Sequence, residues 1–446
     1  MLRSQRVLSI AALRGQHLRA TDDTATPAAA VPENLRKHTK YLLNVYARPS
    51  FVVNRGERCY LYEDTGRRYL DFTAGIAVNA LGHADAQVAE VAAQQARELV
   101  HTSNLYHHPY SGQFAELLVE ASNAVRPGCF SKVFFSNSGT EANEAAFKLA
   151  RKWGKFHGKK SGDQAKKTGI VAFTGAFHGR SMGALSATAT EKYRAPFAPL
   201  VPNFTFAPFD EVNAIAKHIT DDTCAVIVEP MQGEGGINIA SEPFLRALRQ
   251  RCDEVNALLI YDEIQCGMGR TGKLWAHHHY SPECIPDLLT SAKPLANGFP
   301  IGALLASERA ATVFNIGDHG TTFGGSPFAT RLGLHVVERI IEPAFLEAVK
   351  RNGDLLRAQL EEVCVAFPEH IAEVRGVGLL IGVEFRAPPT RFIQLCQERN
   401  LLLVAAGRQT VRVVPPLIVN EQEIHEAIKI WRDALEALEA EQETQT

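Results

Sequence analysis

From about Phe114 to Leu289, stretches with a helical pattern of apolar residues alternate with short apolar runs. The runs cover residues 133–135, 170–173, 225–228 and 258–261. Alternation of this kind predicts a parallel β-sheet flanked by helices, in which ligands lie beyond the carboxyl ends of the strands. Each run is followed directly by polar or glycine-rich residues. The sequence therefore predicts the functional residues at those strand ends.

A chain of 446 residues exceeds the size at which a single hydrophobic core stops growing, so a second compact part is expected. After about Ser326, amphipathic helical stretches and strand-like runs at 379–385 and 411–414 predict a smaller α+β domain. The expected division is a leader and linker (1–33), an N-terminal part of the small domain with a lead-in segment (34–90), a large α/β domain (91–325) and a C-terminal small domain (326–446).

The N-terminus is basic, with Arg3, Arg6, Arg14 and Arg19 among small and apolar residues and no acidic residue before Asp22. This composition is typical of a mitochondrial transit peptide and predicts location in the mitochondrial matrix. A basic amphipathic arm that stays attached is the alternative.

Charge and composition argue against several classes of partner. The formal net charge is -2, and residues of both signs are scattered along the chain. The chain therefore has no strong positive potential that would attract nucleic acid or an anionic membrane. No apolar run reaches the roughly 18 residues of a membrane-spanning helix. The cysteines form no CxxC pair, and the run His277–His279 has no surrounding ligand pattern, so we expect no metal site and a polar surface turn at the histidines.

The segment from Phe134 to Glu141 is expected to leave a strand and begin a helix. Ser138 and Glu141 have the spacing of a capping box. A helix start exposes N–H groups and the positive end of the helix dipole, and Gly139 allows an anion to approach closely. The segment is either a phosphate site or an ordinary strand-to-helix connection.

Two further positions follow apolar runs. Asp262 comes directly after residues 257–261, and a buried carboxylate there needs a cationic partner such as a pyridinium nitrogen. Gln265 is placed to donate to the phenolic oxygen of the same ring. Lys293 follows another apolar run, where partial desolvation would lower its pKa towards the nucleophilic range. The alternatives are an acidic surface turn and a solvated lysine.

These residues lie in motifs by which the chain, from about Tyr46 to Pro416, resembles the class III (ornithine-type) pyridoxal-phosphate aminotransferases. The motifs occur in the family's order: LDFTAGIAV (70–78), NSGTEAN (137–143), FHGR (177–180), EPMQGEGG (229–236), YDEIQ (261–265), TSAK (290–293) and TTFGG (321–325).

The resemblance implies the α/β, type I pyridoxal-phosphate transferase fold, with a mostly parallel sheet in the large domain and a smaller α+β domain. It implies that Lys293 forms a Schiff base with pyridoxal 5'-phosphate, that Asp262 pairs with the pyridine nitrogen and that Gln265 contacts the phenolic oxygen. Gly139 and Thr140 would hold the phosphate.

The resemblance also implies contacts around the ring and the substrate. Phe177 would stack on the cofactor, and Arg180 would bind the substrate α-carboxylate in a bidentate contact. Thr322 would reach the phosphate of a neighbouring subunit, so a homodimer with shared active sites is expected. The substrate-binding residues would also include Thr321, Ile76 and an acid-and-base pair formed by Glu234 and Arg412.

Within the family, the motifs are most similar to members that transfer the δ-amino group of N2-acetyl-L-ornithine to 2-oxoglutarate. Ile76 and His178 stand where members specific for free ornithine carry tyrosine and tryptophan. Free ornithine, 4-aminobutyrate and aminomutase chemistry remain open as alternatives. A non-catalytic relative is disfavoured because Lys293 and Asp262 are both present.

Overall fold

The computed structural model describes residues 33–158 and 167–444. The chain divides into two compact units after Val53. The described part of the first unit contains the helix α1 (Glu33–Tyr41). The predicted leader and linker lie outside the described residues, except for Glu33.

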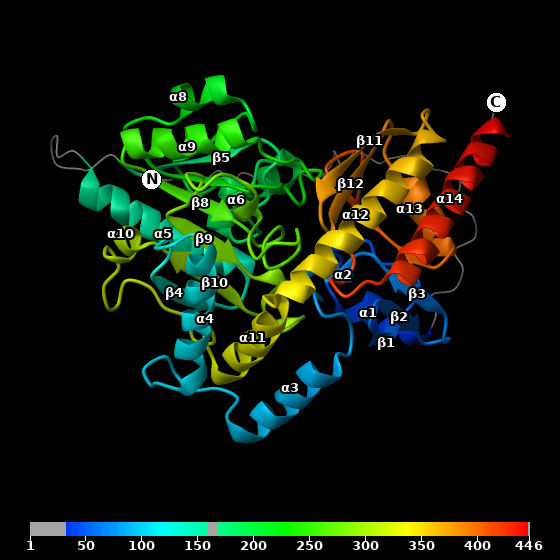
Figure 1. Cartoon of the computed structure of the whole chain (residues 1–446), viewed down its shortest axis with the longest axis horizontal. Helices are drawn as coiled ribbons and strands as arrows, with labels where there is room; N and C mark the ends of the chain where they lie inside the picture. Colours follow the sequence, from blue (N-terminus) through cyan, green and yellow to red (C-terminus); the bar gives the residue numbers. More distant parts are fainter. Residues whose placement is uncertain (1–32, 159–166, 445–446) are drawn as a thin grey trace, which may run out of the picture. The chain divides into compact units, whose positions relative to one another are not determined.

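The second unit is built on a seven-stranded sheet with the strand order β4-β10-β9-β8-β7-β5-β6 (Figure 1). Strand β10 is antiparallel to both of its neighbours, whereas β9, β8, β7, β5 and β6 pair in parallel. The apolar runs in the sequence correspond to β4, β5, β7 and β8, so the predicted mostly parallel sheet is confirmed. The strands are β4 (Lys132–Ser136), β5 (Gly169–Phe173), β6 (Phe204–Ala207), β7 (Thr223–Val228), β8 (Leu258–Asp262), β9 (Leu288–Ser291) and β10 (Gly302–Ala306).

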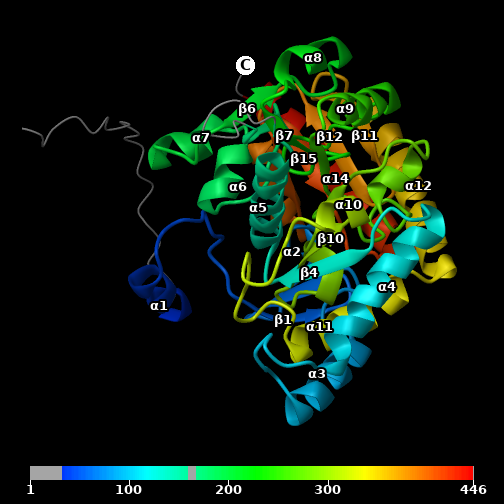
Figure 2. The same ribbon diagram turned by 90° about the vertical axis from the view of Figure 1, so that its left-hand side faces the viewer.

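Helices cover both faces of this sheet because alternate strand residues point to opposite sides. In β7, Ala225 and Ile227 pack in one apolar cluster with α5, while Val226 and Val228 pack in another with α9. Figure 2 labels β7 and these two helices. The helices of this part of the chain are α4 (Pro109–Val125), α5 (Gly139–His157), α6 (Met182–Ala187), α7 (Glu191–Arg194), α8 (Ile215–His218), α9 (Glu242–Glu254) and α10 (Glu308–Ala311). Short 3-10 turns occupy Ala195–Phe197, Val212–Ala214, Ala276–His279 and Lys293–Ala296. None of the described helices is both long and apolar enough to cross a membrane.

Two smaller sheets involve residues from both ends of the chain. One has the order β1-β2-β3-β13, in which β13 pairs in parallel with β3, and the other has the order β11-β12-β15-β14. Their strands are β1 (Val53–Glu57), β2 (Tyr60–Glu63), β3 (Arg68–Asp71), β11 (Ile371–Val377), β12 (Leu380–Phe385), β13 (Leu401–Leu402), β14 (Val404–Ala406) and β15 (Thr410–Val413). The remaining helices are α2 (Ala74–Ala77), α3 (Ala86–Glu98), α11 (Pro327–Ile340), α12 (Pro343–Val365), α13 (Thr390–Glu398) and α14 (Glu421–Glu443). The proposed domain boundaries at residues 90 and 325 stay a prediction.

The predicted surface turn at the three histidines is wrong for His277 and His278, which are both buried. Glu263 is fully buried and accepts hydrogen bonds from the N–H groups of Ala276 and His277, and its Oε1 lies 2.6 Å from His277 Nδ1. A buried carboxylate needs hydrogen-bond donors. The turn that contains the histidines supplies them to Glu263 and is therefore buried.

Candidate active site

Three of the segments singled out in the sequence, those with Gly139, Asp262 and Lys293, meet where strands of the seven-stranded sheet end. Asp262 ends β8 and pairs in register with Thr290 of β9. The first residue of the antiparallel β10, Gly302, pairs with Ser136 at the end of β4. The start of α5, the Asp262 carboxylate and the turn that begins at Lys293 therefore all follow strand ends on the same side.

Helix α5 begins at this edge with backbone N–H groups that have no acceptor within the helix. Ser138 caps the helix by accepting a hydrogen bond from the N–H of Glu141 at 3.3 Å. The Glu141 carboxylate accepts from the N–H of Asn137 at 2.7 Å, so only half of the predicted capping box forms. The N–H groups of Gly139 and Thr140 have no acceptor in the helix and are available to an anion, and phosphate binding by them stays a prediction.

The side chain of Thr140 is held by Ser181, which lies just before α6. Its Oγ1 lies 2.6 Å from Ser181 Oγ and accepts a hydrogen bond from the Ser181 N–H at 3.2 Å. A Cβ atom at Gly179 would lie 2.4 Å from the same oxygen. Glycine at position 179 is therefore required for the chain to pass this close to the start of α5.

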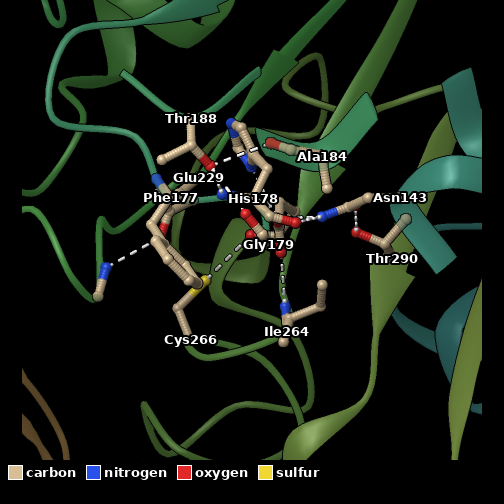
Figure 3. Close-up of polar contacts among 12 residues, drawn as sticks. Asn143, Phe177, His178, Gly179, Ala184, Thr188, Glu229, Ile264, Cys266 and Thr290 are labelled. Carbon is tan, nitrogen blue, oxygen red and sulfur yellow. Dashed lines mark hydrogen bonds and ion pairs between the residues drawn. The ribbon is translucent and has the colours of Figure 1, made fainter. Parts of the chain in front are cut away.

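The Asp262 carboxylate is buried and held by three residues, Asn143, His178 and Ile264, which are labelled in Figure 3. Asn143 Nδ2 donates to Oδ2 at 2.8 Å, His178 Nδ1 lies 2.8 Å from the same oxygen, and the N–H of Ile264 donates to Oδ1 at 3.1 Å. Thr290 Oγ1 donates to Asn143 Oδ1, which fixes the orientation of the amide. A carboxylate offers about four acceptor positions, so one remains for the N–H of a pyridinium ring.

Lys293 follows β9 and begins a short 3-10 turn. Desolvation by the surrounding protein, with a smaller contribution from the positive charge of Arg412, lowers the pKa of Lys293 from 10.5 to about 8. The neutral amine is the nucleophilic form of lysine. This environment suits a lysine that binds the aldehyde of a cofactor covalently.

A contact between Gln265 and Arg412 connects the residues after β8 of the large sheet to the smaller sheet β11-β12-β15-β14. Arg412 of β15 is buried, donates to Gln265 Oε1 at 2.9 Å and forms an ion pair with Glu234 at 3.1 Å. Because a guanidinium only donates, the Gln265 oxygen faces Arg412. The Gln265 amide nitrogen is then left to donate to another group, as contact with a phenolic oxygen requires.

Arg180 lies at the opening of the site. It is exposed, and its guanidinium lies 3.8 Å from the centre of the Tyr193 ring and 5.6 Å from that of Phe177. Stacking on a ring leaves the in-plane N–H donors free, and within the described chain no carboxylate pairs with Arg180. Tyr193 and Glu234 line a surface cleft of about 370 Å³.

Ile76 lies in an unusual turn. All residues of α2 have positive φ, with values of 46° at Ala74, 65° at Gly75, 65° at Ile76 and 61° at Ala77. A left-handed conformation costs about 1–2 kcal/mol per non-glycine residue and is a genuine outlier for a β-branched one. The turn is stabilised by Asp71, which accepts hydrogen bonds from the N–H groups of Thr73 and Ala74. Backbone strain of this kind clusters at binding sites.

Thr321 contacts the residues at the start of α5, whereas the neighbouring Thr322 does not. Thr321 Oγ1 accepts a hydrogen bond from Asn137 Nδ2 at 3.2 Å, beside the start of α5. Thr322 is exposed and has no hydrogen-bond partner among the described residues. The single chain therefore does not bring Thr322 into the site.

Four contributing residues, Asn143, His178, Tyr193 and Glu229, were not assigned a role in cofactor binding, although His178 was singled out as a position that differs from the ornithine-specific members. A signal existed for two of them. Glu229 directly follows β7 as Asp262 ends β8, and Asn143 lies about one helical turn after Gly139 on the same face of α5. The contacts of His178 and Tyr193 depend on long-range packing and had no local signal.

Together these groups fit pyridoxal phosphate. The helix start offers N–H donors for the phosphate, Asp262 has a remaining acceptor position for the ring nitrogen, and Lys293 has a lowered pKa. Phe177 is half-buried at the same place, with its N–H donating to Glu229.

Comparison with known proteins gives the same result. The aminotransferase class-III family matches residues 43–435. A mitochondrial acetylornithine aminotransferase from Neurospora crassa is 48% identical over 406 residues, covering 91% of this chain and 87% of the relative.

The solved structures that are similar to this chain are also aminotransferases. The N-acetylornithine aminotransferase of Stenotrophomonas maltophilia is 33% identical with a TM-score of 0.76, covering 91% of this chain and 98% of the other. The ornithine aminotransferase of Toxoplasma gondii, crystallised with partial occupancy of pyridoxal phosphate at its active site, is 28% identical with a TM-score of 0.85, covering 93% and 97%. The chain therefore belongs to the class-III aminotransferases, pyridoxal-phosphate-dependent enzymes of the type I fold.

Proposed function

We propose that this enzyme transfers the δ-amino group of N2-acetyl-L-ornithine to 2-oxoglutarate, giving N-acetyl-L-glutamate 5-semialdehyde and L-glutamate in arginine biosynthesis. The observation that carries the proposal is the 48% identity, over 91% of the chain, with a relative named for acetylornithine. Ile76 supports it, because an aliphatic side chain offers no acceptor for the α-ammonium of free ornithine. Acetylation replaces the charged ammonium with a neutral amide, which costs less to leave without a partner.

Bound pyridoxal phosphate supplies an electron sink for the carbon that carries the amino group. Asp262 keeps the ring nitrogen protonated, and Gly139 and Thr140 bind the phosphate. Lys293 first holds the cofactor and then, as a free amine, moves the proton at the reacting carbon. Its lowered pKa supports this role, because a general base works best when its pKa lies near the working pH.

Arg180 binds the α-carboxylate of the amino donor. Its free in-plane donors and its position over Tyr193 support this role. The ion pair between Glu234 and Arg412 lets the same site bind two substrates that differ in their number of carboxylates. Glu234 shields Arg412 while the donor is bound, and release of Arg412 provides a second cation for the additional carboxylate of 2-oxoglutarate.

The working unit is a homodimer in which Thr322 of one subunit contacts the phosphate bound by the other. The exposure of Thr322 supports this arrangement, since its side chain is free to meet a partner. The enzyme acts in the mitochondrial matrix. The basic N-terminal composition and the mitochondrial relatives support this location.

Purified enzyme tests the function directly when kcat/KM is measured with 2-oxoglutarate and three donors: acetylornithine, ornithine and 4-aminobutyrate. The cost of one unpaired polar group predicts that acetylornithine is preferred over ornithine by about 5- to 150-fold. Lys293→Ala serves as the control, since loss of all three activities assigns them to this site. A preference for ornithine or 4-aminobutyrate would overturn the proposed donor.

A further inference from the structure

His178 is the least expected partner of the Asp262 carboxylate. Its Nδ1 lies 2.8 Å from Asp262 Oδ2, and the side chain is fully enclosed. The backbone on both sides of the ring is also fixed, because the His178 N–H donates to Thr188 Oγ1 at 3.0 Å and its carbonyl accepts from Asn143 Nδ2 at 2.7 Å. The backbone that carries the imidazole is therefore held in place beside Asp262 (Figure 3).

The proton positions on this imidazole follow from its surroundings. An ionised carboxylate only accepts hydrogen bonds, so Nδ1 must carry the proton that points to Asp262. His178 Nε2 is buried and has no hydrogen-bond partner among the described residues. A second proton on Nε2 would bury a charged donor without an acceptor, which is more costly than leaving a neutral lone pair unpaired.

The other nearby carboxylate does not meet this nitrogen. The two oxygens of Glu229 accept hydrogen bonds from the N–H groups of Phe177 and Gly233, at 3.0 and 2.9 Å. Both oxygens of Glu229 are therefore engaged elsewhere, and neither accepts a hydrogen bond from His178 Nε2.

We propose that His178 is a positioning residue that holds Asp262 through a neutral Nδ1–H donor, fixing the carboxylate without cancelling its charge. The full negative charge of Asp262 is then available to the ring nitrogen of the cofactor. Asn143 is the second neutral donor to the same oxygen, so both side chains that orient Asp262 leave its charge intact. This inference rests on the proposed role of Asp262.

A set of substitutions at position 178 separates the donor from the charge and from packing. His178→Asn keeps a neutral N–H donor near the Nδ1 position, His178→Gln carries the same amide one carbon further out, and His178→Phe keeps a ring without a donor. The dissociation constant of pyridoxal phosphate for each apoprotein is measured by the change in visible absorbance on binding. Asp262→Asn is measured beside them.

His178→Phe and His178→Gln are expected to bind pyridoxal phosphate about tenfold more weakly than wild type or worse, the scale of one hydrogen bond to a charged group. His178→Asn is expected to stay within about threefold, since the donor is restored; a purely structural role would not be rescued in this way. Equally weak binding by the Asn and Phe variants would overturn the neutral-donor role, and unchanged binding by the Phe variant would overturn any role in positioning.

If Asp262→Asn binds as tightly as wild type, the proposed role of Asp262 fails and the inference falls with it. If only Asp262→Asn is impaired, the inference about His178 alone is wrong.

Discussion

Replacing Lys293 with methionine should stabilise the apoprotein, because a chargeable amine is removed from a site that disfavours its charge. The pKa of Lys293 falls from 10.5 to about 8 in the folded protein, chiefly through desolvation. One pH unit corresponds to about 1.4 kcal/mol, so below about pH 8 the ammonium form lowers the free energy of unfolding by about 3 kcal/mol. Methionine has a similar length and cannot be protonated.

The sign of the pH dependence follows from the direction of the shift. Since the folded pKa lies below the unfolded one, the unfolded chain binds more protons between about pH 8 and 10.5, and wild-type stability falls as the pH falls through this window. The advantage of Lys293→Met should therefore be about 3 kcal/mol at about pH 7 and shrink to about 1.5 kcal/mol at about pH 9.5. Urea unfolding of both apoproteins at the two pH values measures it. The control is Lys217→Met, which changes an exposed lysine of α8 and should show no such pH-dependent difference. Equal stability of Lys293→Met and wild type at about pH 7, or a difference that does not change with pH, would refute the reasoning.

Three further predictions concern the proposed substrate and subunit contacts. Arg180→Lys loses a planar bidentate contact, so kcat/KM for the amino donor should fall by about 5- to 150-fold in steady-state assays; an unchanged value would show that another group binds the carboxylate. Ile76→Tyr provides a hydroxyl acceptor, so the ratio of kcat/KM for acetylornithine over ornithine should narrow, and a ratio insensitive to this residue would place selectivity elsewhere. Thr322→Glu puts a negative charge beside the partner's phosphate and should inactivate the enzyme. Mixing it with inactive Lys293→Ala should restore activity, because a hybrid dimer has one site with both residues intact; no recovery after proven subunit exchange contradicts a shared site.

The strands of the large sheet and the residues at their ends could be predicted because their signals are local. The apolar runs at β5, β7 and β8 are buried on both faces, and such strands are short and continuously apolar, whereas β4 is buried only at its end. Asp262 and Lys293 follow strands in sequence, and parallel pairing alone brings strand ends to one edge. The structure therefore brings these residues together as expected, while their chemical roles stay predictions.

Other features could not be predicted because they depend on contacts between distant residues or contradict local preference. The bond between Asn143 and Asp262 joins α5 to β8 across more than a hundred residues. No propensity predicts Ile76 at a φ of 65°; Asp71 holds the start of that turn through the N–H groups of Thr73 and Ala74. His278 was expected at the surface because histidines are polar, but the buried Glu263 holds the turn inside.

The antiparallel strand β10 has a consequence for how the protein can open locally. Lys293 lies on a connection of ten residues between β9 and β10, which pair with each other as the third and second strands of the sheet order and are fully buried. Asn297 ties the same connection to residues 81–82 through its side-chain amide. Backbone amides in such a place exchange with deuterium only when a large cooperative part of the structure unfolds. Lys293 thus follows closely after a strand whose amides are expected to exchange slowly, and we expect the motion that admits and releases substrates to come from the exposed residues around it.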